Sequence, residues 1–247
     1  MKLSRIDVLI YLLLFICIIS LPVGWLKLPL LYELIILIGV RLLLLGFFIY
    51  KICKNKIKVF ENCAIKELLI FLPFFMICFS NIFASLFGGG FILSETSVLI
   101  LFLQIFLCLL SAILEEIVFR LFIHNSLDNF SPLKRIIVGA FIFAICHFIN
   151  VLNVRSINGF INLLLQTLYT FGLGLVLGFI YEYSHSLTFV VILHFIFNLL
   201  NDILYRFFGG YTTTLAFILT AVGITILAAA YGITLYIFKF RKKEIQE

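Results

Sequence analysis

The sequence predicts an all-α integral membrane protein that crosses the bilayer about eight times. Hydrophobic residues make up 64% of the 247 residues, charged residues make up 12%, and the mean hydropathy is +1.25. So few polar residues cannot cover the surface of a water-soluble globule. A spanning helix needs about 20 apolar residues, so a chain of this length has room for at most about seven to nine passes. Composition and length together therefore exclude a soluble fold.

Hydropathy divides the chain into eight apolar segments. We expect spans over residues 8–21, 30–50, 68–87, 97–122, 136–149, 158–183, 187–204 and 215–238. The first segment follows Lys2 and Arg5 as a signal peptide would, but no small-x-small cleavage pattern follows it, so we expect an uncleaved span. Three glycines at 88–90 mark the end of the third span.

The basic residues predict the orientation. With a cytoplasmic N-terminus, fourteen Lys and Arg residues fall on the cytoplasmic side and three outside, with Arg41 left inside the second span. This asymmetry predicts a multi-pass protein of the cell membrane with both termini in the cytoplasm. The net charge of +6 is thereby explained by short loops and the tail, so the bilayer is an expected partner and nucleic acid is not.

The fourth span carries the most informative polar residues. Glu115, Glu116 and Arg120 interrupt an apolar run, and ionisable groups near hydrocarbon indicate a functional site. On a helix, Glu116 and Arg120 are i and i+4 and lie one above the other, while Glu115 points about 100° away. One acid can pair with the arginine and the other can face something else. The alternative is a structural ion pair that fixes helix packing, with Glu115 reaching for the interface.

Two more spans each carry a histidine. His147 follows Phe143 by four residues, and His194 precedes Asn198 by four, so each pair shares a helical face. A buried acid with two imidazoles and an amide supports hydrolysis by an activated water. Glu115, His147 and His194 could instead hold a divalent metal such as zinc. The sequence leaves open whether the cofactor is one divalent metal or none.

These residues resemble three motifs of a known family. Glu115-Glu116-x-x-x-Arg120, Phe143-x-x-x-His147 and His194-x-x-x-Asn198, in this order on three spans, are similar to those of the CAAX-protease and bacteriocin-processing (CPBP, or Abi) family of intramembrane proteases. Gly172 to Gly178, followed by Tyr181-Glu182 and Ser186-Leu187, also resembles the family's run between its second and third motifs. The resemblance covers residues 97–202.

The resemblance implies an eight-helix membrane fold with its catalytic core on spans four to seven. It implies that Glu115 is the general base, that His147 and His194 position the water, and that Asn198 contributes to the oxyanion site. Supporting positions would be Glu116, Arg120 and Phe143. We accordingly expect N-terminal spans in 1–96, a catalytic core in 97–204, and a last span with a basic tail in 205–247.

The expected function is an intramembrane endopeptidase that cleaves a membrane-associated protein or peptide. Richness in Ile, Leu, Phe, Lys and Asn indicates an AT-rich bacterial genome, which favours peptide maturation or bacteriocin immunity over prenyl-protein maturation. The alternative from another class is a non-catalytic membrane scaffold or immunity protein with the same fold. A transporter that uses the same groups as a proton relay is the third hypothesis.

Other polar or small residues receive structural interpretations. Glu33 and Arg41 are expected to anchor the second span, and the Gly172–Gly178 stripe to permit close helix packing. His124 and His185 are expected in solvated loops.

Overall fold

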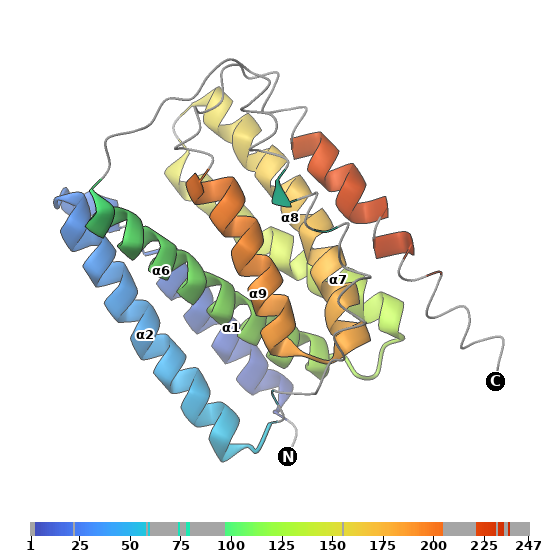
Figure 1. Cartoon of the computed structure of the whole chain (residues 1–247). Helices are drawn as coiled ribbons and strands as arrows, with labels where there is room; N and C mark the ends of the chain where they lie inside the picture. Colours follow the sequence, from blue (N-terminus) through green and yellow to red (C-terminus); the bar gives the residue numbers. More distant parts are fainter. Residues whose placement is uncertain are drawn as a thin grey trace, which may run out of the picture.

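The computed structural model describes residues 3–21, 23–57, 59, 74, 78–79, 97–154, 156–204, 221–230, 232–234 and 237. Every regular element within these ranges is helical, as the sequence predicted (Figure 1). The longer helices are α1 (Arg5–Ile19), α2 (Leu30–Lys54), α6 (Val98–Glu116), α7 (Pro132–Phe148), α8 (Ile157–Ser184) and α9 (Leu187–Asn198). Short 3₁₀ segments, η1 (Val23–Leu26) and η4 (Ile149–Asn153), follow α1 and α7.

Two α-helices continue as π-helices. Helix α6 continues as a π-helix, η3 (Ile117–His124), and α9 continues as a second one, η5 (Leu199–Leu204). These segments begin directly after Glu116 and directly after Asn198, two of the residues that the sequence motifs select. Because π-helical turns are rare and concentrate at functional sites, their positions support the expected location of the site.

Four described helices are long and apolar enough to cross a membrane: Leu30–Lys54, Val98–His124, Pro132–Val151 and Ile157–Ser184. They correspond to the second, fourth, fifth and sixth predicted spans, so the protein is a multi-pass membrane protein. Helix α1 has 15 residues, or about 22 Å, and α9 has 12, which is short of a core about 30 Å thick. The third predicted span and the Gly88–Gly90 stop lie almost wholly outside the described residues, and the eighth span is described in part. The total of eight spans stays a prediction.

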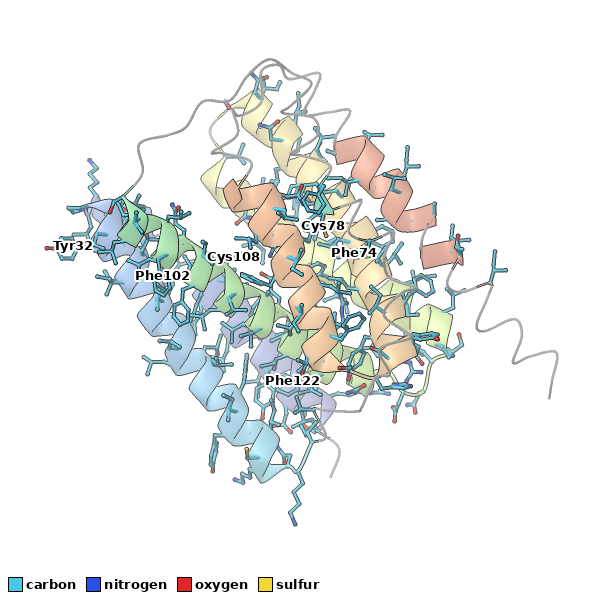
Figure 2. All side chains as sticks on the ribbon, in the orientation of Figure 1. Tyr32, Phe74, Cys78, Phe102, Cys108 and Phe122 are labelled. Carbon is cyan, nitrogen blue, oxygen red and sulfur yellow. The ribbon has the colours of Figure 1, made fainter. Side chains whose placement is uncertain are left out.

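The helices form one bundle in which α9 is central. Helix α9 contacts α6 on one side and α8 on the other, while α2 packs along α6 and α7 packs along α8 (Figure 1). The helical residues 221–230 lie against α8, where Gly172 meets Thr225 and Ala228. Figure 2 shows Phe74 and Cys78 beside α9, and the Asn201 side-chain amide donates a 2.9 Å hydrogen bond to the Cys78 carbonyl.

Aromatic side chains fix the end of α6. The ring of Phe122 on η3 lies 5.2 Å from Tyr11 of α1 and 5.4 Å from Phe48 of α2, centroid to centroid. Phe119 packs edge-on to Phe15 of α1 at 5.7 Å. Figure 2 marks Phe122 where these three helices approach each other. Such aromatic pairs add to the free energy of packing, so the turn that carries the two acids is held on a rigid base.

A two-residue turn joins α8 to α9. His185 takes a left-handed conformation with φ of 49° and ends α8, and Ser186 accepts a hydrogen bond from the Phe189 backbone N–H at the start of α9. A serine N-cap satisfies one of the N–H groups that a helix start leaves free. The short connection makes α8 and α9 adjacent, antiparallel helices and thereby brings His194 beside the core of the bundle.

Glycines allow close packing between α7 and α8, as the small-residue stripe predicted. A Cβ atom at Gly174 would lie 3.0 Å from the Ala140 Cα, and one at Gly178 would lie 3.0 Å from the Ile136 side chain. Both distances are below ordinary van der Waals contact. The two helix backbones therefore approach each other at positions where only hydrogen fits, one turn away from Phe143.

This contact can be tested with a matched pair of alanine substitutions. We expect Gly174→Ala to lower the free energy of unfolding in detergent, because the added methyl meets α7 backbone. Gly139→Ala, on α7 with open space around its Cβ, should raise it by up to about 1 kcal/mol through helix propensity. The two variants should differ by about 1–3 kcal/mol in thermal or denaturant unfolding. Equal stabilities would show that α7 and α8 can separate without cost.

Candidate active site

The two acids of the fourth span are buried at the end of α6. Glu115 is 8% exposed, Glu116 is fully buried and Arg120 is 1% exposed. The Arg120 Nε lies 2.9 Å from the Glu116 Oε2, so the expected i, i+4 ion pair is present, although the contact lacks hydrogen-bond alignment. Glu115 forms no hydrogen bond to any described residue. The two neighbouring carboxylates thus differ: Glu116 has a close ion-pair partner, and Glu115 has no hydrogen bond within the described residues.

His194 of α9 lies between these carboxylates. Its Nδ1 is 2.7 Å from the Glu116 Oε1, and its Nε2 is 3.7 Å from the Glu115 Oε2. A carboxylate accepts, so we assign the hydrogen to Nδ1, and the neutral ring then presents a lone pair at Nε2. The distance of 3.7 Å is too long for a hydrogen bond and short enough for one water molecule to contact both groups. The Nε2 of His194 is therefore directed towards the Glu115 carboxylate.

Phe143 contacts both histidines. Its buried ring lies edge-on to His147 at 4.8 Å and to His194 at 5.9 Å, and the Arg120 guanidinium lies 5.5 Å from its centroid. The His147 Nδ1 donates a 2.9 Å hydrogen bond to the Phe143 carbonyl, which orients that imidazole as well.

Asn198 lies one helical turn beyond His194 at the end of α9, half-buried, and forms no hydrogen bond with the described residues. The four-residue spacing places it on the His194 side of the helix. Its amide is thus free to contact a group that enters from outside the bundle.

The sequence left a divalent metal on Glu115, His147 and His194 as one of two possibilities. Within the described ranges, no group of three or more His, Cys, Asp or Glu side chains is arranged to hold a metal ion. The Nδ1 of His194 is bonded to the Glu116 carboxylate and the Nδ1 of His147 to the Phe143 carbonyl, which leaves the Nε2 of each ring available. A divalent ion on Glu115, His147 and His194 therefore stays a prediction.

A second buried charge cluster was missed from the sequence. His124, expected in a solvated loop, is 2% exposed at the end of η3, so that expectation was wrong; His185 is exposed as predicted. The His124 Nε2 lies 2.6 Å from one Glu182 oxygen, and the Arg135 Nη2 donates to the other at 2.9 Å. The cluster ties η3, α7 and α8 together. Extension of the span by a π-helix buries His124, and no local pattern in the sequence signals that extension.

A comparison with known proteins gives a family match over the helices that carry these residues. Residues 97–200 match the family model described as Rce1-like, type II CAAX prenyl endopeptidase Rce1-like. This stretch is Rce1-like. The match confirms the family that the three motifs indicated, and it contains all seven candidate site residues.

The Rce1-like family consists of intramembrane proteases, which supports protease activity in a multi-pass membrane protein. The matched region contains helices α6, α7, α8 and α9, whereas α1 and α2 lie outside it. Neither the curated proteins nor the solved structures contain a match to this chain.

Proposed function

We propose that this Rce1-like protein is an intramembrane endopeptidase that hydrolyses a peptide bond by a Glu115-activated water. The observation that carries the proposal is the position of His194, with one ring nitrogen bonded to Glu116 and the other 3.7 Å from Glu115. A non-catalytic scaffold has no need of an imidazole that one buried acid orients towards a second acid, which itself forms no hydrogen bond with the described residues. The Rce1-like match of residues 97–200 supports the same activity.

In the proposed mechanism, one water molecule donates a hydrogen bond to Glu115 and another to the Nε2 of His194. Glu115 removes the first proton while the water oxygen bonds to the scissile carbonyl carbon, whose π electrons move to the carbonyl oxygen. The Asn198 amide donates a hydrogen bond to this oxyanion, and His147 helps to hold the water. The carbon–nitrogen bond then breaks, and Glu115 returns the proton to the leaving amine.

The supporting residues keep these groups in place. Glu116 fixes the tautomer of His194, and Arg120 balances the charge of Glu116. The Phe143 ring packs against both imidazoles. Because these groups are buried and already oriented, little reorganisation is needed as charge develops in the transition state.

We also propose the bounds of the catalytic core, the orientation in the membrane, the substrate class and the biological role. The catalytic core would be 97–204, between the N-terminal helices of 1–96 and the last segment 205–247, in a cell membrane protein with both termini in the cytoplasm. Its substrate would be a membrane-associated protein or peptide, and its role bacterial peptide maturation or bacteriocin immunity. The excess of Lys and Arg on the expected cytoplasmic side supports the orientation. An amino-acid composition typical of AT-rich genomes supports the bacterial role.

A substitution of His194 tests the function. Membrane peptides from cells that express the wild-type protein should contain fragments whose yield falls about a hundredfold or more with His194→Gln, measured by quantitative mass spectrometry. His185→Asn is the matched control, since His185 is exposed and asparagine tolerates its left-handed conformation. Identical fragments from all three proteins would contradict a protease and favour a scaffold.

A further inference from the structure

Arg41 is a cation in the middle of a membrane helix and lies outside the region that matches the family. It is half-buried on α2, whose neighbours along the helix are apolar. A charged group at this depth is costly unless it finds a partner, so its contacts show what it does.

The contacts of Arg41 lead to the catalytic helix. Its Nη1 donates a hydrogen bond to the Ser111 hydroxyl of α6, and that hydroxyl donates to the Leu107 carbonyl at 2.7 Å. Ser111 lies four residues before Glu115, so both face the same side of α6. The Arg41 guanidinium also interacts electrostatically with Glu115, while its buried Nε has no hydrogen-bond partner among the described residues.

The charges around the two acids explain why a second cation is needed. Two adjacent carboxylates repel each other inside a low-dielectric bundle, and each requires a positive or hydrogen-bonding partner of its own. Glu116 has Arg120 and the Nδ1 of His194. Glu115, 3.7 Å from His194, has no comparable bonded partner in the described structure, and Arg41 is held by Ser111 one turn before it on α6.

We propose that Arg41 is a positioning residue that supplies the counter-charge for Glu115, with Ser111 fixing the guanidinium on α6. This role rests on the proposed function, because it matters for catalysis only if Glu115 is the base. It means that the matched core does not complete its own site: one of the N-terminal helices supplies the balancing charge.

A double-mutant cycle tests the contact without any substrate. Thermal unfolding in detergent is measured for the full-length wild type, Arg41→Met, Glu115→Gln and the double variant. We expect the double variant to unfold several degrees above the value that adding the two single losses predicts, because each single change leaves the other charge buried and unbalanced. Additive losses would overturn the proposal.

Fragment formation tests the catalytic consequence. The initial rate for the fragments defined by the His194 comparison should fall about tenfold or more with Arg41→Met and about threefold with Ser111→Ala. Arg41→Lys, which keeps the charge, should restore the rate to within about threefold of wild type, a rescue that a packing role would not give. Lys51→Met is the control, since Lys51 lies near the end of the same helix over the Tyr11 and Phe47 rings.

The outcomes separate the two proposals. Wild-type fragments that form at the same rate with Arg41→Met would overturn the role of Arg41 and leave the protease intact. Absence of fragments from the wild-type protein would overturn the proposed function, and the catalytic role of Arg41 with it.

Discussion

Replacing Glu115 by Gln should abolish proteolysis while the protein still folds. Gln keeps the size of the side chain and can still hydrogen-bond a water molecule, but it cannot accept a proton. General-base catalysis contributes about 10²–10⁴-fold to a rate, so the fragments found with wild-type protein should fall by up to about 10⁴-fold. The measurement is fragment yield in proteoliposomes at matched protein amounts, with helix content checked by circular dichroism.

Two further variants make the result specific to this carboxylate. Glu115→Asp keeps the base but retracts it by one methylene, so it should retain a reduced rate above that of Glu115→Gln. Glu33→Gln removes a carboxylate in the first turn of α2, away from the candidate site, and should cleave as the wild type does. Full cleavage by Glu115→Gln would remove Glu115 as the base.

Replacing Glu116 by Gln should cause the largest loss of stability. Glu116 is fully buried and is the partner of both Arg120 and His194, which are themselves 1% and 2% exposed. Removing one member of a buried ion pair leaves the others without a counter-charge and costs about 3–5 kcal/mol. Reversible unfolding in detergent should show this loss, and proteolysis should fall too, because nothing then fixes the tautomer of His194.

A compensating variant separates these two effects. The double variant Glu116→Gln, Arg120→Met removes the Arg120 charge together with its Glu116 counter-charge. The free energy of unfolding should therefore partly recover. Proteolysis should not return, since His194 still lacks its carboxylate. If Glu116→Gln unfolds within about 1 kcal/mol of wild type, the ion pair is not the element that holds α6 and α9 together.

Local periodicity predicted what lies within one helix. The helical class follows from long apolar segments, and the Glu116–Arg120 and Phe143–His147 pairs follow from a spacing of four residues. The structure shows each of them. The Gly174 contact with α7 follows in the same way from a stripe of small residues. These features depend on sequence neighbours, so a single sequence is enough to predict them.

Contacts between helices were not predictable in the same way. Which acid bonds His194, and that Arg41 reaches Ser111, depend on how each helix is rotated and shifted against the next, over separations of 78 and 70 residues. The burial of His124 depends on the π-helix that extends α6, and hydrophobic periodicity of 3.6 residues carries no signal for such a change in winding.

The bond between Glu116 and His194 also constrains how a peptide can arrive. Because it joins α6 to α9, any movement that parts these two helices would undo the protonation pattern on which the water depends. In the proposed mechanism, a peptide would therefore enter along another flank of the bundle, while α6 and α9 stay in contact throughout turnover.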